Sequence, residues 1–292
     1  MGELLKGKVA VVTGSGRGLG LAHSKAMVAQ GAKVVINDIG AAKDGTCTDN
    51  KIADDAVAEI KQSGGEAVAN YDSIATPEGA VNLIKTAMDN FGRLDILVNN
   101  AGFIWSGIMI GDMTDEDWDT QLRIHLYGHF FCAREAAKIF VPQKSGRIIN
   151  TSSIGGFGFP GLTSYAAAKE GIVGLTRSLA FELGVHGITV NCLRPTAGTR
   201  WAANPEETSK TRPAEGVSPL VVYLASDAAD NVNGCIFRVV SGLIGIYRDP
   251  PYIEQTIVKD GIFTPEELIE QLPKTLTAGK AREISAKPKG AI

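Results

Sequence analysis

Short, almost wholly apolar runs alternate with longer amphipathic stretches along the first 240 or so residues of the sequence. Lys8–Thr13 (KVAVVT) and Lys33–Asp38 (KVVIND) are two such runs. Continuous Val/Ile segments are typical of strands that are covered on both faces. Strands that alternate with helices form parallel sheets with right-handed crossovers. The pattern therefore predicts an α/β fold, a doubly wound parallel sheet with helices on both faces.

The same pattern predicts one Rossmann-like domain, residues 1–247, followed by a C-terminal extension, residues 248–292. Further strands are expected at 66–70, 94–98, 147–151, 188–193 and 235–240, and helices at 19–30, 52–62, 79–91, 116–140, 164–184 and 217–225. The extension contains a short amphipathic helix at 265–272, and its Lys/Ala/Pro-rich end is expected to be disordered. Residues 40–50 form a polar insertion after the second strand.

Composition excludes several classes of partner. The net charge is −3, and the basic residues are scattered, which argues against nucleic acid and anionic membranes. No apolar stretch approaches the length of a membrane span, and the charged start of the chain does not resemble a secretory signal. The four cysteines lie far apart without ligand spacing, so no metal site or disulfide is expected. These features indicate a protein of the cytoplasm or of an organelle matrix, and the cytoplasm is the expected location.

A glycine-rich turn follows the first strand, where Thr13–Gly20 reads TGSGRGLG. Glycines there allow a sharp turn and a close approach of the backbone to a pyrophosphate, which then meets the amides of the following helix. The segment fails GxGxxG because of Leu19, but it is complete as TGxxxGxG. A plain tight turn is the alternative. The residues expected at the cofactor are Gly14, Arg17, Gly18, Leu19 and Gly20.

Asp38 ends the second strand, 18 residues after Gly20. A carboxylate at this place accepts hydrogen bonds from both ribose hydroxyls of an adenosine and repels a 2′-phosphate. The sequence therefore predicts NAD as the cofactor, in preference to NADP. Arg17 argues in the opposite direction, since enzymes that use NADP can have a basic residue in this turn. The alternative for Asp38 is a simple cap on the turn.

Tyr165 and Lys169 share one face of a predicted helix because they are four residues apart. Bringing a tyrosine pKa from about 10 to about 7 requires roughly 4 kcal/mol. One ammonium about 4 Å away contributes about that much at an effective dielectric constant of about 20. The pair is thus a plausible acid/base, and Ser152 or Ser153, just before the helix, can hold the substrate oxygen. Either serine can instead be a cap.

In this order, these motifs resemble the short-chain dehydrogenase/reductase family over about residues 6–247. The resemblance rests on TGxxxGxG, on the Asn99–Gly102 turn (NNAG), on the serine pair and on Tyr-x-x-x-Lys. It implies that Tyr165 is the catalytic acid/base, that Lys169 lowers its pKa and binds the nicotinamide ribose, and that a serine orients the substrate. It also places Asn99, Ala101, Gly102 and Thr151 at the cofactor.

Several stretches are similar to the (3R)-hydroxyacyl-CoA dehydrogenase part of multifunctional β-oxidation enzymes. They include Val34–Gly40, Gly64–Ile74, Asp115–Phe131 and Arg194–Arg200. This likeness implies that Asp72 and Ser73 contact the adenine, and that Pro195 to Thr199 contact the nicotinamide amide.

Three departures from the family pattern stand out. The usual asparagine of the long middle helix is His125, which either redirects a water-mediated proton path or simply packs. The segment before Tyr165 is one residue short, so counting back gives Ser152 whereas the strand end gives Ser153. Ser153 is preferred, because a deletion is easier in the glycine-rich 155–161 loop. The tail beyond Tyr247 has no counterpart in the family core.

The expected activity is NAD-dependent interconversion of a secondary alcohol and a ketone, on a 3-hydroxyacyl-CoA-like substrate. The alternatives are a hydroxysteroid or alicyclic-alcohol dehydrogenase, and a catalytically silent NAD-binding subunit. Segments 103–113, 155–162 and 198–212 are expected at the substrate, and the polar stretch 205–211 argues against a large lid. The aromatic and apolar residues that suggest a hydrophobic or ring-bearing substrate are Phe103, Ile104, Trp105, Phe157, Phe159 and Trp201.

The resemblance also implies assembly. Helices 116–140 and 164–184 are the family's usual dimer surface, so a homodimer or homotetramer is expected. The helix of the tail is a candidate cover for the substrate pocket of its own or a neighbouring subunit.

Overall fold

One eight-stranded sheet forms the centre of the molecule, in the order β3-β2-β1-β4-β5-β6-β7-β8. The computed structural model describes residues 2–42, 48–200, 204–248, 251 and 253–278. The strands are β1 (Val9–Thr13), β2 (Lys33–Asn37), β3 (Ala67–Asn70), β4 (Ile96–Asn99), β5 (Gly146–Thr151), β6 (Ile188–Thr196), β7 (Ile236–Val240) and β8 (Leu243–Ile246). β1 to β7 are parallel, so the predicted fold class is confirmed.

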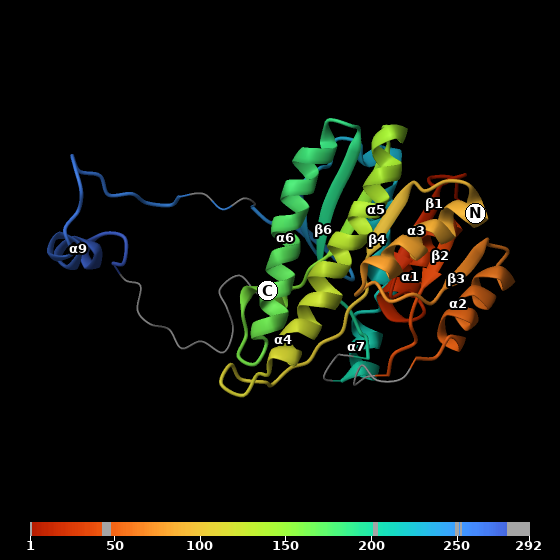
Figure 1. Ribbon diagram of the computed structural model, residues 1–292, viewed down its shortest axis with the longest axis horizontal. Helices are drawn as coiled ribbons and strands as arrows, with labels where there is room; N and C mark the ends of the chain where they lie inside the picture. Colours follow the sequence, from red (N-terminus) through yellow and green to blue (C-terminus); the bar gives the residue numbers. More distant parts are fainter. Residues whose placement is uncertain (1, 43–47, 201–203, 249–250, 252, 279–292) are drawn as a thin grey trace.

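Helices cover both faces of this sheet (Figure 1). They are α1 (Gly18–Ala29), α2 (Lys51–Gln62), α3 (Pro77–Phe91), α4 (Asp115–Leu122), α5 (Gly128–Gln143), α6 (Thr163–Gly184), α7 (Pro205–Thr211), α8 (Ser218–Ala225) and α9 (Pro265–Gln271). Ala10 and Val12 of β1 pack toward α1, α2 and α8, whereas Val9 and Val11 pack toward α3, α5 and α6. Burial of each of these valine side chains stabilises the fold by about 1.5–3 kcal/mol.

The strand order reverses between β1 and β4, which are direct neighbours. The chain runs outward from β1 to β3 on one side and from β4 to β8 on the other. In open parallel sheets, ligands bind in the crevice beyond the carboxyl ends of the strands at such a point. The fold therefore predicts a ligand-binding site at the turns after β1, β2, β4, β5 and β6.

Three local features differ from the sequence-based expectations. The long middle helix is interrupted by one turn of π-helix, η1 (Arg123–Tyr127), between α4 and α5. Residues 205–211 form the short helix α7, where only a polar segment was foreseen. β8 is an additional, antiparallel strand, joined to β7 by a tight turn in which Gly242 has a φ of 77°.

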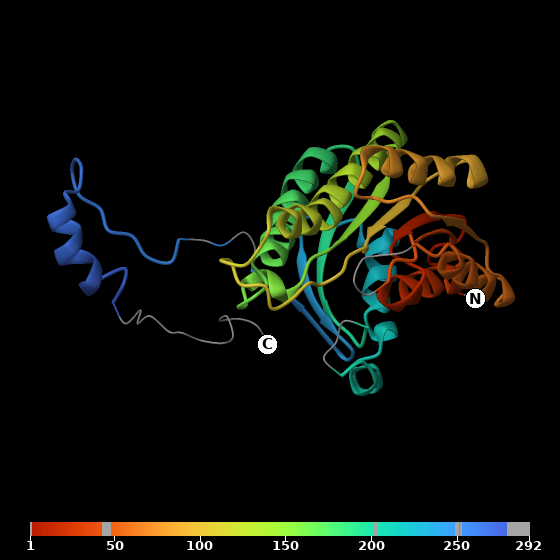
Figure 2. The same ribbon diagram turned by 60° about the horizontal axis from the view of Figure 1, so that its bottom comes forward.

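The C-terminal extension leaves the sheet after β8. In both Figure 1 and Figure 2 its helix α9 lies apart from the α/β body, and none of its residues is among those that line the cavity described below. Thr264 and Glu267 form a capping box at its start, and Lys259 forms an ion pair with Glu267 at 2.7 Å. The predicted helix is confirmed, whereas the domain boundary at 247/248 stays a prediction. The chain end, 279–292, and part of the 40–50 insertion, 43–47, lie outside the described residues.

No helix in the described ranges combines the length and hydropathy needed to cross a lipid bilayer.

Candidate active site

A cavity of about 1220 Å³ opens at the carboxyl edge of the sheet, beside the β1/β4 switch point. Most of the residues that the motifs assign to cofactor and catalysis line it, although they come from seven separate segments. They are Gly14, Arg17, Gly18, Leu19, Asp38, Asp72, Ser73, Ala101, Gly102, Thr151, Ser153, Tyr165, Lys169, Pro195 and Thr199. The fold therefore brings together groups that are up to 185 residues apart in the chain (Gly14 to Thr199).

Two expected cofactor residues lie behind this lining. Gly20 supports the turn from below, since a Cβ atom there would come within 2.3 Å of the Gly14 carbonyl oxygen. Asn99 is fully buried, and its amide nitrogen donates to Asn150 Oδ1 at 3.0 Å. Both residues shape the cavity without forming its surface.

The glycine-rich turn is pressed against the turn after β4. Gly14 has a φ of 61°, and a Cβ atom there would lie 2.7 Å from Ala101 Cα. Thr13 Oγ1 accepts hydrogen bonds from the amides of Asn100 and Ala101 at 2.9 and 3.0 Å. Helix α1 begins at Gly18, and within the described residues no side chain caps its first amides. In the described part of the chain, the N-terminal amides of α1 are uncapped and the glycine turn in front of them has no side chains in the way, so the diphosphate of a dinucleotide can bind there.

Asp38 stands beside this turn with its carboxylate held in place. Its Oδ2 accepts from the Gly16 amide at 3.0 Å, and its Oδ1 accepts from the Gly40 amide at 2.8 Å. A carboxylate oxygen can accept two hydrogen bonds, so each retains capacity for a ribose hydroxyl. The cradle and the acidic group together fit the adenosine half of a nicotinamide dinucleotide.

Asp72 and Ser73 form the next part of the wall, after β3. Asp72 accepts from the side-chain amides of Asn70 and Asn82 at 2.7 and 3.0 Å. The Ser73 hydroxyl accepts from the Ala75 amide at 3.3 Å. Both residues are thus fixed by their own loop at the cavity edge.

Tyr165, Lys169 and Ser153 meet at the far end of the cavity. The side chains of Ser153 and Tyr165 are hydrogen-bonded. Lys169 Nζ donates to the Thr151 carbonyl at 2.7 Å and lies 5.6 Å from the centroid of the Tyr165 ring. The Ser152 hydroxyl donates to the Lys169 carbonyl at 2.8 Å, so it faces helix α6. Of the two serines, Ser153 is the one that joins the tyrosine.

Burial dominates the electrostatics of this group. It raises the pKa of Tyr165 to about 12, while the hydrogen bond with Ser153 acts in the opposite direction. It also lowers the pKa of Lys169 to about 7. Burial penalises the charged forms of both groups, so it opposes the lowering of the tyrosine pKa that Lys169 is expected to provide, and that role stays a prediction.

The π-turn directs His125 inward, against the tyrosine. Its ring lies edge-on to Tyr165, with centroids 5.2 Å apart, and Nε2 donates to the Phe103 carbonyl at 2.7 Å. Nδ1 has no hydrogen-bond partner among the described residues. Burial and the positive charge of Lys169 hold the pKa of His125 well below its usual value, so the ring is neutral. His125 thus packs against the acid/base group and fixes the loop after β4.

The wall on the substrate side is largely apolar. Phe103, Ile104 and Trp105 line the cavity as expected, and the Phe103 and Trp105 rings are 4.9 Å apart in an edge-to-face arrangement. Phe157 instead covers Arg194 at 4.4 Å and lies outside the cavity lining, as does Phe159. Trp201 lies outside the described residues.

Sequence reasoning missed part of this wall. Glu116, Thr120 and Ile124 contribute to it from α4 and the π-turn. Their spacing of four residues was a usable signal, because it places them on one helix face. Arg200 belongs to the segment 198–212 that was expected at the substrate, but it lines the cavity on the side of the cofactor.

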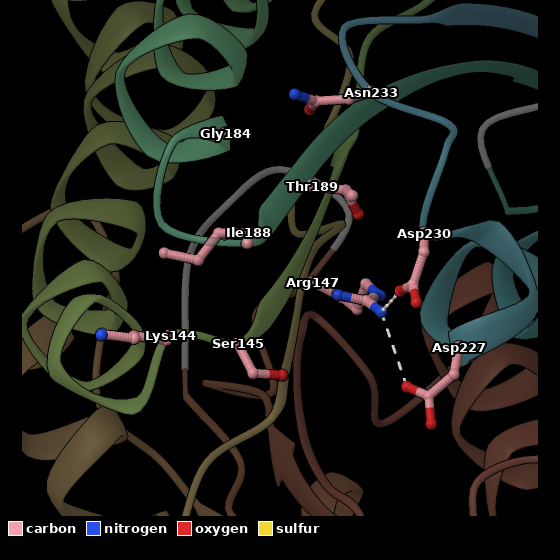
Figure 3. Close-up of a pocket in the computed structure, with 10 residues that line it drawn as sticks. Lys144, Ser145, Arg147, Gly184, Ile188, Thr189, Asp227, Asp230 and Asn233 are labelled. Atoms are coloured by element: carbon pink, nitrogen blue, oxygen red, sulfur yellow. Dashed lines mark hydrogen bonds and ion pairs between the residues drawn. The ribbon is translucent and has the colours of Figure 1, made fainter.

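A second pocket, of about 440 Å³, lies at the opposite edge of the sheet, where β5 and β6 begin (Figure 3). Arg147 reaches toward Asp227 and Asp230, with which it forms ion pairs. It also donates to the carbonyls of Gly146 and Ser226. The positive charge of Arg147 is thus compensated by two aspartates of the same chain, and we interpret this pocket as a structural ion-pair site.

Comparison with known proteins decides the family. The model of the short chain dehydrogenases matches residues 8–209. The chain belongs to this family. The predicted class of activity, an oxidoreductase, is confirmed with it.

Curated relatives extend the likeness beyond the motifs. A short-chain type dehydrogenase/reductase of Mycobacterium tuberculosis is 46% identical over 231 residues, which cover 77% of this chain and 80% of the relative. The hydroxyacyl-CoA dehydrogenase ChsB1 of the same organism is 37% identical, with 92% and 88% covered. The peroxisomal multifunctional enzyme type 2 of Mus musculus is 42% identical over 83% of this chain, which spans only 33% of that enzyme.

Solved structures share the fold. A short chain dehydrogenase from Mycobacterium avium is 40% identical, with 96% of this chain and 97% of that chain covered and a TM-score of 0.84. Carveol dehydrogenase from the same organism, solved in complex with NAD, is 26% identical, with 81% and 97% covered and a TM-score of 0.73.

Proposed function

We propose that this chain oxidises a 3-hydroxyacyl-CoA-like secondary alcohol to the ketone, or catalyses the reverse reaction, with NAD as cofactor. The observation that carries the proposal is the meeting of Tyr165, Ser153 and Lys169 at the end of a cavity with an apolar wall. Two relatives support the substrate class, the hydroxyacyl-CoA dehydrogenase ChsB1 and, over part of its length, the mouse multifunctional enzyme.

The roles of the residues follow from their positions. The hydroxyls of Ser153 and Tyr165 hold the substrate oxygen between them, and in oxidation Tyr165 takes the proton of the alcohol. Lys169 stands behind the ring as the positive group that favours the phenolate. Tyr165 and Lys169 are residues that would adjoin a bound nicotinamide, which would supply the hydride acceptor and, in its oxidised form, a positive charge that opposes the effect of burial on the pKa of Tyr165.

The adenosine end supports NAD. The Asp38 carboxylate is held by two backbone amides and keeps acceptor capacity toward the cavity. A 2′-phosphate would meet this negative charge at close range, which costs free energy in a partly buried site. A relative solved with NAD is consistent with this choice.

A ring alcohol is the second candidate substrate. Phe103 and Trp105 form an edge-to-face aromatic wall in the cavity, a surface that suits an alicyclic or steroid skeleton as well as an acyl chain. A catalytically silent NAD-binding subunit is the third possibility, and it predicts no turnover with either class.

A homodimer or homotetramer in the cytoplasm completes the proposal. Phe181 of α6 and Val185, the residue after its end, are 85% and 82% exposed in the single chain, and Phe130 of α5 is exposed as well. Exposed apolar side chains on two long helices favour contact with a second copy. Light scattering of the purified chain measures the assembly.

The first test of the function compares the wild-type chain with Tyr165→Phe. NADH formation at 340 nm is followed with 3-hydroxyacyl-CoAs, hydroxysteroids and alicyclic alcohols, and NADP is tested in parallel. Loss of the proton-transfer group is expected to lower kcat by about 10²–10⁴-fold, while the Kd for NADH, measured by its fluorescence, stays the same. Turnover of ring alcohols but not of acyl-CoAs would refute the proposed substrate. Equal activity of the variant would refute the role of Tyr165.

A further inference from the structure

Two arginines from distant segments meet at one carbonyl oxygen on the rim of the cofactor cavity. Arg17 of the glycine-rich turn donates from Nη2 to the Ala41 carbonyl at 2.8 Å. Arg200, which follows β6, donates from Nη1 to the same oxygen at 3.0 Å. All three residues line the cavity, so the two guanidinium groups lie side by side at its edge.

The segment after β6 comes close to the phosphate turn at this point. A Cβ atom placed on Gly18 would have Thr199 Cγ2 as its nearest neighbour, at 3.9 Å. Arg200 is the next residue, and its side chain reaches the stretch that follows β2. It therefore bridges the two rims of the adenosine half of the cavity.

Among the described residues, Asp38 is an acidic group beside the two guanidinium groups, and its oxygens are held by the amides of Gly16 and Gly40. Burial lowers the pKa of Arg200, the positive charge of Arg17 lowers it further, and Asp38 raises it. Two like charges side by side are unfavourable, and an anion between them relieves the repulsion.

We infer that Arg17 and Arg200 form a phosphate clamp over the cofactor, and that Arg200 is a cofactor-binding residue outside the family motifs. The inference rests on the proposed function. Guanidinium groups present planar sets of N–H donors that match phosphate oxygens, so the ligand chemistry is a phosphate of the dinucleotide. The diphosphate is the expected partner, because Asp38 disfavours a 2′-phosphate. The clamp also ties the segment that leads into the substrate wall to the bound cofactor.

The test measures binding, without any substrate. NADH and NADPH are titrated by fluorescence, and ADP-ribose and adenosine by their competition with NADH, for the wild type and Arg200→Gln. We expect Arg200→Gln to raise the Kd for NADH and ADP-ribose about tenfold, as for the loss of one charge-assisted bond, and to leave adenosine unchanged. Arg212→Gln is the matched control. This arginine of the same segment is exposed, and it binds the Gly198 amide through its backbone carbonyl, which the substitution leaves in place.

Two further variants separate a clamp from a structural role. Arg17→Gln combined with Arg200→Gln is expected to weaken NADH binding by less than the product of the single effects, because both groups hold one phosphate. Arg200→Lys keeps the charge and is expected to recover part of the affinity, and thermal unfolding confirms that each variant is folded.

The outcomes are distinct. Weakening confined to NADPH assigns the clamp to the 2′-phosphate. An equal loss for adenosine, or no loss for any ligand, overturns the clamp. If the wild type binds neither NADH nor NADPH, the proposed function itself fails, whereas normal NADH binding by both wild type and Arg200→Gln refutes only this inference.

Discussion

Replacing Gly102 with alanine tests the packing that joins the cofactor turn to the acid/base group. The backbone of Gly102 is one that alanine can adopt, since its φ is not in the left-handed region. The added Cβ, however, would lie 2.3 Å from His125 Cε1 and 2.7 Å from Nδ1. Ordinary contacts between carbon atoms are about 3.5–4.0 Å long, so the imidazole must move by more than about 1 Å.

The imidazole has little freedom to move. It is 1% exposed, it is bonded to the Phe103 carbonyl, and the Tyr165 ring abuts it. Overpacking of this kind costs about 1–3 kcal/mol, and weakening of the buried hydrogen bond adds about 1 kcal/mol. We expect Gly102→Ala to lower the free energy of unfolding by about 2–4 kcal/mol, which corresponds to a Tm lower by roughly 5–15 °C.

A double-mutant cycle with His125→Ala isolates the clash. In that background the space for the new methyl group is available, so Gly102→Ala is expected to cost less than about 0.5 kcal/mol. Gly174→Ala is the control, because its Cβ would have no described neighbour within 4 Å, and helix α6 gains about 0.5–1 kcal/mol from alanine. Urea unfolding and calorimetry give the values. An equal cost of Gly102→Ala with and without the imidazole would refute the reasoning.

Three further predictions follow from other parts of the structure. Burial lowers the pKa of His23 to about 3, so that only the unfolded chain binds its proton as the pH falls below about 6.5. The free energy of unfolding is therefore unaffected by this residue above pH 6.5 and is lower by roughly 2–3 kcal/mol near pH 4.5. His23→Gln should make the free energy of unfolding in urea depend less on pH, and an unchanged pH dependence would contradict this. Asp38→Asn removes the charge that opposes a 2′-phosphate, so the ratio of kcat/KM for NADP to that for NAD should rise at least about tenfold; a constant ratio would show that Asp38 does not select the cofactor. Ending the chain after Tyr247 should leave the Kd for NADH and the Tm of the body unchanged, because α9 lies apart from the α/β body and contributes no residue to the cavity lining; a higher Kd would show that the tail of a neighbouring copy reaches the cavity.

The tertiary structure also separates residues that look equivalent in the sequence. Ser152 and Ser153 are both candidates from their position at the strand end, but the hydroxyl of Ser152 is used by the backbone of α6. Phe157 and Phe103 are both aromatic residues in expected substrate loops, but Phe157 turns to cover Arg194. A one-residue shift along a strand or a loop reverses the direction of a side chain, and local sequence does not set that direction.

Local sequence is sufficient to predict the alternation of buried strands and helices, the turn at Thr13–Gly20 and the face shared by Tyr165 and Lys169. These features depend on hydrophobic period and turn chemistry, which act over a few neighbouring residues. Three other features become visible only in the folded chain: the π-turn places His125 against Tyr165, β8 pairs with β7, and Arg200 reaches Ala41 across 159 positions of the chain. Such contacts join residues that are distant in sequence, and their geometry exists only after the sheet has brought its carboxyl ends together.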